Sequence, residues 1–471
     1  MARTGIRKTA LSLAVAGAFA GGASQAYAAA FALIEQNASG LGNSYAGAAA
    51  VAEDASTIYY NPAGMSLLPG GMQISAGVAL INLSAKFSDS ASVASGTGIP
   101  GVPNAQRPLG GNGGDAGGLS AVPNFYFATD VAPNIKLGVG VSVPFGLATK
   151  YDADWMGRFQ AIKSDISTLN VNPTISYKLN ENTSFGFGLN YQRIDAELTN
   201  AINYVAATFG GVLAATGSLA TAQAAANGIP AANAEGTVAV KGSDTGLGFN
   251  AGAMFQLSPE TRLGVSYRSA IKYTVTGTVT FSNQAGLPAA VAAQLADGNV
   301  SLDIKMPDSA SFALQHKLDP KLTLLADVTW TGWSKIKELK IVRDNGTTLS
   351  TTPENFKNTW RVGAGAIYRY DDAWSIKTGL AYDQTPVNET DRTARLPDNN
   401  RLWLSFGGQY RLSKDAALDF GYAHLFLKSG SINQPSAQAI QSGANPTLSG
   451  QLVGTYKGSV DILGAQFAYR F

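Results

Sequence analysis

The chain has 471 residues and a formal net charge of +2, so its charge offers no electrostatic case for binding nucleic acid. It contains no cysteine and two histidines, His316 and His424, which excludes a disulfide scaffold, thiol catalysis and thiolate metal sites. The histidines lack the spacing of a metal site, and we expect no metal or cofactor. Its 53 glycines and 38 phenylalanine and tyrosine residues (20 and 18), with 14% charged residues, favour the strands of a membrane barrel.

Residues 1–28 predict a cleaved signal peptide. Basic residues near the start precede an apolar run from Ala10 to Phe19, and Ala26-Tyr27-Ala28 supplies the small-x-small pattern of a cleavage site. The apolar run is too short for a helix that spans a bilayer. We therefore expect export, with a mature chain that begins at Ala29.

Residues 29–70 do not fit the pattern of a membrane strand. They are rich in alanine, glycine, serine and asparagine, and Pro62, Pro69 and Gly70 lie near their end. A wide barrel without a plug would be an aqueous pore. We therefore predict that residues 29–70 form a mainly helical hatch inside the lumen of a barrel made by residues 71–471.

Apolar and polar residues alternate with a period of two in several segments, most clearly in 185–192, 246–257, 360–370 and 401–412. Successive side chains of a strand point to opposite faces, so each segment has one apolar and one polar face. A soluble sandwich would place the apolar face inward. Tyrosine and tryptophan often end the apolar rows, as in the aromatic girdle of a membrane barrel, and this favours apolar faces turned toward lipid.

Pattern and turn signals predict fourteen strands with alternating short and long links. This is the plan of an all-β, antiparallel, multi-pass barrel in the outer membrane of a Gram-negative bacterium, with the long loops outside. The approximate spans are 71–87, 120–130, 135–150, 163–179, 183–199, 235–257, 261–282, 298–318, 321–343, 357–370, 374–386, 400–412, 415–428 and 450–471. The short turns are at 132–134, 180–182, 258–260, 319–320, 371–373 and 413–414.

The third predicted strand contains a feature that weakens a closed wall. Pro144 cannot donate a ladder hydrogen bond, and Gly146 permits a bend beside it. An ordinary bulge would explain the same residues. Pro173 in the adjacent strand either weakens the same wall or makes a simple bend.

Two long outer loops are unusually apolar. Residues 201–232 carry no charge, and residues 283–297 have apolar side chains at helix-like spacing. Exposed apolar surface is unfavourable unless it packs together or binds something. We expect two short helical lids around a capture groove, with packing of the loops on each other as the alternative.

Several short motifs follow one another in order along the chain. They are Ser39-Gly40-Leu41-Gly42, Tyr45-Ala46-Gly47, Ala52-Glu53-Asp54-Ala55, Tyr60-Asn61-Pro62-Ala63-Gly64, Phe145-Gly146-Leu147-Ala148-Thr149, Phe356-Lys357 with Arg361, Tyr370-Asp371-Asp372-Ala373-Trp374, and Pro397-Asp398 followed by Arg401-Leu402-Trp403-Leu404-Ser405. In this order they resemble the FadL family of long-chain fatty acid transporters over nearly the whole mature chain. Alternation up to the terminal Phe471 also looks like the assembly signal of outer-membrane barrels, which implies the barrel-assembly machinery as a partner.

The resemblance implies a monomeric transporter in contact with outer-membrane lipid. The outer loops capture a fatty acid, which passes to an inner pocket and leaves sideways through the wall without energy input. The gate of the hatch would be Asn61, Pro62, Ala63 and Gly64, and the lateral opening Pro144, Phe145 and Gly146. Uptake of aromatic or alkane hydrocarbons by the same fold is the first alternative. A general porin and a membrane-embedded enzyme are weaker, and the enzyme lacks a recognisable Ser–His–acid set.

The ligand-binding residues follow from the resemblance and from strand phase. Phe31 and Leu33 are predicted to contact the tail. A carboxylate in a partly dry lumen needs a cation or several donors. The candidate cations are Arg193, Lys340, Arg361, Lys377 and Arg401, and each has the alternative of pairing with lumen acids such as Asp327, Asp383 or Asp419.

Overall fold

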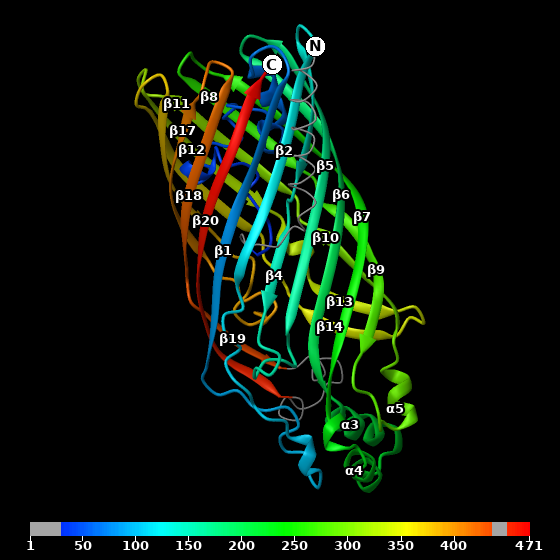
Figure 1. Ribbon diagram of the computed structural model, residues 1–471. Coiled ribbons are helices and arrows are strands. Elements are labelled where there is room, and N and C mark those ends of the chain that lie inside the picture. Colours follow the sequence, from blue (N-terminus) through cyan, green and yellow to red (C-terminus); the bar gives the residue numbers. More distant parts are fainter. Residues whose placement is uncertain (1–29, 436–449) are drawn as a thin grey trace, which may run out of the picture.

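The computed structural model describes residues 30–435 and 450–471, so the predicted signal peptide and the predicted mature start lie outside the described residues. The strands form one antiparallel sheet that closes on itself, because β1 (Gln73–Asp89) pairs both with β2 (Gly118–Ala132) and with β20 (Gln451–Arg470). The result is the long cylinder of Figure 1. No helix in the described part of the chain is both long and apolar enough to cross a membrane.

The strand segments combine into fourteen barrel strands, as predicted. Six barrel strands are interrupted once: for example, β3 and β4 both pair with β5, and β8 and β9 both pair with β7. The other interrupted strands are β10 with β11, β12 with β13, β14 with β15, and β18 with β19. The remaining bounds are β3 Ile135–Ser142, β4 Gly146–Lys150, β5 Lys163–Asn180, β6 Thr183–Asn203, β7 Glu235–Gln256, β8 Thr261–Arg268, β9 Ile271–Phe281, β10 Gly298–Met306, β11 Ser309–Lys317, β12 Leu322–Thr331, β13 Glu338–Arg343, β14 Thr348–Pro353, β15 Thr359–Arg369, β16 Trp374–Asp383, β17 Arg401–Arg411, β18 Ala416–Leu427 and β19 Gly430–Pro435.

The apolar rows point away from the lumen. Leu247 is 74% exposed and Leu463 is 60% exposed, whereas Asn190 and Gln192 on the opposite face of β6 are each 1% exposed. Such a surface is unfavourable in water and suits the hydrocarbon of a bilayer, where the closed ladder satisfies the backbone. The predicted orientation of the alternating segments is therefore confirmed.

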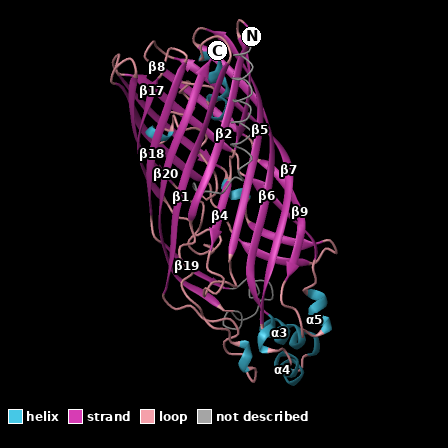
Figure 2. Ribbon diagram, viewed as in Figure 1, coloured by secondary structure: helices cyan, strands magenta, loops and turns pink. Residues whose placement is uncertain are grey.

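The two ends of the barrel differ, as the lengths of the links predicted. The C-terminus lies at the end with short turns, and the helical loops lie at the other end (Figure 2). The apolar loop 201–232 carries α3 (Tyr204–Thr216) and α4 (Leu219–Asn227), and loop 283–297 carries α5 (Ala289–Gln294). The remaining short helices of the outer loops are η3 (Pro103–Ala105) and η4 (Ala231–Asn233). A further short helix, η5 (Trp333–Lys335), lies at the interruption between β12 and β13.

The hatch fills the lumen at close range. It contains η1 (Leu41–Asn43), α2 (Thr57–Tyr60) and η2 (Pro62–Leu67), joined by turns. The facing wall carries glycines where the backbone of the hatch approaches. A methyl group at Gly264 would lie 1.9 Å from the carbonyl oxygen of Ala49, and one at Gly379 would lie 2.2 Å from the backbone of Asn43. The lumen is therefore shaped to the hatch.

Adding a methyl group at Gly264 should loosen the hatch without unfolding the barrel. We expect Gly264→Ala to increase the rate at which a thiol reagent labels an Ala32→Cys reporter by about tenfold or more, because overpacking costs about 1–3 kcal/mol. The chain has no native cysteine to interfere. Gly118→Ala in β2 is the control, because nothing lies within 4 Å of the added methyl group. Equal labelling in both variants would contradict the close fit.

Candidate functional site

A cavity of about 150 Å³ lies between the hatch and one side of the barrel wall. The hatch contributes Leu33, Tyr45 and Tyr59 among others, and the wall contributes β8, β11, β12 and β15, which are consecutive neighbours in the sheet. The cavity also reaches Pro144 and Phe145. It therefore adjoins both the predicted gate and the predicted lateral opening.

One end of the cavity is apolar and aromatic. Leu33 lines it together with Phe145 and Trp333. Phe31 packs behind this surface, with its ring centroid 4.8 Å from that of Trp333 and 6.1 Å from that of Phe145. The structure thus brings together the two residues predicted to contact the tail, Leu33 directly and Phe31 as its support.

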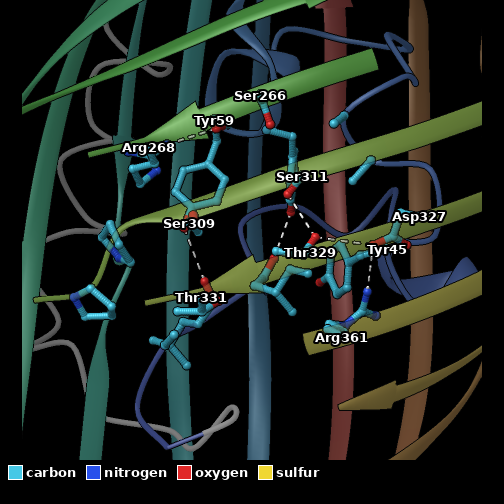
Figure 3. A pocket seen from close by; sticks show the side chains of 18 of the residues that line it. Tyr45, Tyr59, Ser266, Arg268, Ser309, Ser311, Asp327, Thr329, Thr331 and Arg361 are labelled. Carbon is cyan, nitrogen blue, oxygen red and sulfur yellow. Dashed lines mark hydrogen bonds and ion pairs between the residues drawn. The ribbon is translucent and has the colours of Figure 1, made fainter. Parts of the chain in front are cut away.

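The other end is polar, with hydroxyl groups between two arginines (Figure 3). Ser311 and Thr329 are hydrogen-bonded to each other at 2.8 Å. Arg268 donates to the Asn190 side chain at 2.6 Å and to the Tyr59 carbonyl at 2.9 Å. Its guanidinium lies over the Tyr59 ring, 4.3 Å from the centroid. This end can donate several hydrogen bonds to an anionic or polar group.

Arg361 is the only one of the predicted headgroup cations that lines this cavity, within the described residues. It is buried, forms an ion pair with Asp327 at 3.4 Å and donates to the carbonyl of Ser44. Its Nε has no hydrogen-bond partner among the described residues. The predicted pairing of Arg361 with a lumen acid is therefore present, and its Nε–H remains available to donate to a ligand.

The other predicted cations lie elsewhere. Arg401 is buried against Asp398, and Lys377 ties the hatch to the wall through Glu53 at 2.6 Å and Asp419 at 3.3 Å. Both fit the alternative of pairing with acids.

Two of the predicted ligand-binding cations are not in the lumen. Arg193 was expected to face inward, but it is 53% exposed on the outer face and pairs with Asp195. Lys340 is also exposed, and it alternates with Leu339 and Ile341, which line a cavity of the lumen. The prediction that Arg193 and Lys340 face the lumen is therefore wrong, because both strands continue beyond the apolar band with charged residues on their outer face.

Arg268 and the hydroxyl row were not predicted as site residues. Arg268 follows the alternating segment Leu263–Tyr267, and the direction of its side chain was not assigned from the sequence. Ser309 and Ser311, and Thr329 and Thr331, are each two residues apart and thus share one face of a strand. That spacing was the available signal.

The barrel wall is interrupted beside the cavity. The ladder between β2 and β3 ends at Phe125 opposite Val141. On the other side, β3 stays paired with β5 up to Ser142 opposite Asn170, and β4 resumes at Gly146 opposite Ser167. Residues 143–145 thus oppose only the two residues 168–169, so this wall strand has one extra residue relative to β5, as in a bulge.

The start of the hatch covers the edge of this bulge. Leu33 donates its backbone N–H to the Pro144 carbonyl at 2.8 Å, and Gly146 donates to the Phe31 carbonyl at 2.8 Å. The Gln36 side chain donates to the Val143 carbonyl at 2.7 Å and accepts from the Val143 N–H at 3.1 Å. Residues 31–36 therefore occupy hydrogen-bonding positions that a neighbouring wall strand would otherwise use.

The predicted gate residues fix the hatch to β6 and β7 of the wall. Asn61 is fully buried, and its side-chain amide donates to the carbonyls of Ala49 at 2.7 Å and Ala253 at 3.1 Å. Its side-chain oxygen accepts from Ala63 and caps η2. A methyl group at Gly64 would lie 2.0 Å from the Thr57 hydroxyl, so the turn admits only glycine at this position.

Glu35 is a fully buried residue of the hatch and lies within residues 31–36, the segment that covers the bulge. Neither carboxyl oxygen has a hydrogen-bond partner among the described residues. Burial raises the pKa of Glu35 to about 7, although the charges of Arg401 and Arg361 act in the opposite direction. A neutral carboxyl group fits this environment better than an ionised one.

A second cavity, of about 140 Å³, lies at the end with the helical loops. Its lining is mainly apolar, including Val240, Phe281, Leu295 and Ile341. The helices α3, α4 and α5 pack on each other through a separate apolar cluster that contains Phe209. The loops therefore do pack together, and an apolar cavity remains beside them.

The sequence profile described as "Outer membrane protein transport protein (OMPP1/FadL/TodX)" matches residues 19–471. The chain belongs to this family. It is 29% identical over 452 residues to the "Long-chain fatty acid transport protein" of Escherichia coli strain K12, covering 94% of this chain and 96% of the relative. It is 31% identical over 490 residues to the "Putative outer membrane protein NMB0088" of Neisseria meningitidis, covering 100% of both. Localisation in the outer membrane of Gram-negative bacteria follows from these family relations and the barrel.

Solved structures agree with the family. A FadL homologue of Pseudomonas aeruginosa has a TM-score of 0.81 at 25% identity, with 94% of this chain and 100% of that chain covered. The toluene transporter TbuX of Ralstonia pickettii has a TM-score of 0.63 at 18% identity, with 93% and 100% covered, which shows a shared fold. The protein is thus an outer-membrane transport protein for hydrophobic compounds.

Proposed function

We propose that the protein takes up long-chain fatty acids by passive transport, with residues 29–70 as the hatch and residues 71–471 as the barrel. The observation that carries this proposal is the polarity of the inner cavity. Leu33, Phe145 and Trp333 offer an apolar surface for a tail, and Arg268 and Arg361 offer cationic donors for a carboxylate. The similarity to the fatty acid transport protein of Escherichia coli supports the same substrate class.

The proposed route begins at the apolar outer cavity, continues to the inner cavity and ends sideways at the bulge of residues 143–145. A lateral exit keeps the tail in an apolar phase. Exit through the lumen would expose it to periplasmic water at about 0.8 kcal/mol per CH₂, or more than about 10 kcal/mol for an eighteen-carbon chain. The covering segment, residues 31–36, would have to leave the wall before the substrate passes, because it is hydrogen-bonded to the edge of the bulge.

Uptake of aromatic hydrocarbons is the second candidate, and the size of the inner cavity favours it. At about 150 Å³ the cavity is comparable with the engineered apolar cavity of about 150 Å³ that admits benzene. The polar end argues against this reading, since a hydrocarbon would leave the arginines and hydroxyls without a partner. The substrate therefore depends on whether the cationic end is used.

Replacing Arg268 of the inner cavity should distinguish between these two candidate substrates. We expect Arg268→Gln to reduce uptake of labelled oleate by about tenfold and to leave uptake of labelled toluene unchanged, because a hydrogen bond to a charged group contributes about 1.5–3 kcal/mol. The measurement is uptake by a deletion strain that carries each gene. Arg193→Gln is the control, because Arg193 lies on the outer face. Equal losses for both substrates would refute recognition of a carboxylate.

A further inference from the structure

Two lysines lie directly opposite each other on the outer wall. Lys86 of β1 is in register with Lys457 of β20, and both side chains are exposed. They alternate with inward residues such as Phe87 and Tyr456, which are buried, so both ammonium groups point away from the lumen. The pair lies toward the end of the barrel with the helical loops, beyond the apolar band. Like charges directly opposite each other on neighbouring strands are destabilising.

The acids near this pair do not neutralise it. Asp115 approaches Lys86 at 3.9 Å, but both side chains are well exposed, and such pairs contribute little. Asp461 already accepts hydrogen bonds from Tyr422 at 2.7 Å and from His424 at 2.8 Å. Lys457 forms no ion pair within residues 30–435 and 450–471. The two lysines therefore carry an excess positive charge on the outer surface.

Below the lysines the same three strands present a graded surface. One step toward the apolar band, Ser84 lies opposite Ser459, which in turn lies opposite Phe426 of β18. Phe426 is 51% exposed, and its ring lies 4.4 Å from that of His424. Two further steps along, Leu80 and Leu463 are opposite each other and exposed to lipid. The rows from the outer end toward the apolar band are the two lysines, then the two serines with Phe426, then Asn82 and Asp461 with His424, and last the two leucines.

We propose that this surface of β18, β20 and β1 binds a phosphorylated glycolipid of the outer leaflet. Lys86 and Lys457 bind its phosphate, with Ser459 as a donor beside them, whereas the Ser84 hydroxyl stays hydrogen-bonded to Asp115 at 2.7 Å. The exposed ring of Phe426, with the partly exposed ring of His424 beside it, carries a sugar. The acyl chains lie along Leu80 and Leu463. An ammonium group near a membrane surface attracts anionic lipid by about 1 kcal/mol each, and the phosphate removes the repulsion between the lysines.

Thermal unfolding in neutral detergent, with and without a bis-phosphorylated disaccharide glycolipid, tests this site. Without glycolipid, Lys457→Gln should be at least as stable as the wild type, because the repulsion is gone. With glycolipid, the wild type should become the more stable protein. The apparent Kd for the glycolipid should rise about fivefold in Lys457→Gln and about thirtyfold in the double variant with Lys86→Gln. Such a reversal of the order of stability does not follow from a merely structural role.

The control variant is Lys317→Gln combined with Lys321→Gln, since these exposed lysines lie at the opposite end of the barrel. It should bind glycolipid as the wild type does. The dephosphorylated glycolipid should bind about thirtyfold more weakly to the wild type, and inorganic phosphate should not compete at equal concentration. Equal affinity for the dephosphorylated lipid, full competition by inorganic phosphate, or unchanged binding in the double variant would each overturn the proposal.

Discussion

Deletion of Pro144 is expected to abolish uptake of the hydrophobic substrate, by more than tenfold, while the barrel remains folded. The register explains the choice of this single residue. Three residues, 143–145, oppose two residues of β5, so removing one restores a continuous ladder from β3 into β4. The side chains that point into the lumen also change across the bulge. They are at even-numbered positions in β3, such as the buried Ser142, and at odd-numbered positions in β4, such as the buried Leu147 and Thr149. After the deletion, the side chains of β3 and β4 alternate as those of one continuous strand.

On the β2 side the ladder stops at Phe125, and contact resumes only where Lys150 donates its N–H to the Ala116 carbonyl at 3.0 Å. A continuous strand would be able to pair with β2 across this gap, with the Lys150 contact shifted by one residue. The proposed lateral route would be closed, and the remaining exit through the lumen costs more than about 10 kcal/mol for a long acyl chain. The measurement is uptake of labelled oleate by cells. Heat-modifiable migration in gels checks that the barrel is folded.

The matched variant is Pro144→Ala, which keeps the number of residues and therefore the bulge. It should retain most of the uptake, since the extra residue rather than the missing N–H sets the register. Normal uptake by the deletion variant, with a folded barrel, would rule out the lateral route. Loss of uptake in both variants would show that proline itself is needed and would contradict the proposed role of the extra residue.

The barrel was predictable because each of its determinants is local. Alternation in segments such as 246–257 fixes the two faces of a strand, and the short turns fix which neighbours pair. Even the six interruptions leave the count intact, because both pieces of a strand keep the same neighbours. The helical lids followed in the same way from apolar residues at helix-like spacing, and Pro144 indicated the bulge.

The binding residues were harder to predict because they depend on distant pairings. Strand phase identified Arg361 as inward, whereas Arg193 continues the outward row of Leu189 and Tyr191 and was assigned to the lumen against that phase. The role of Arg268 depends on Tyr59 of the hatch, which is 209 residues away. The contacts of residues 31–36 with the bulge likewise join segments that no periodicity connects.

Residues 31–36 of the hatch are expected to bind the barrel wall less tightly as the pH rises from about 5 to 8, because Glu35 lies among them. Its pKa is about 7 in the folded protein and 4.5 for an ordinary glutamate. Between these values the docked hatch binds a proton that the released hatch loses, so docking weakens as the pH rises and changes little above about 8. Arg361, Arg401, Asp383 and Tyr45 are the charged and titratable groups that act on Glu35.

The difference of about 2.5 pKa units corresponds to about 3 kcal/mol, and between pH 5 and pH 8 it gives just under about a hundredfold change in hatch opening, because the released Glu35 is already largely ionised at pH 5. Labelling of the Ala32→Cys reporter at pH 5 and pH 8 measures it. In Glu35→Gln the amide cannot ionise, so the reporter's labelling should keep only the pH dependence of the thiol itself. Dividing the labelling rate of the reporter with Glu35 by its rate with Glu35→Gln at each pH removes that dependence. A ratio that does not change with pH would show that Glu35 keeps one protonation state throughout, and that the hatch is held by the Gln36 and Asn61 contacts alone.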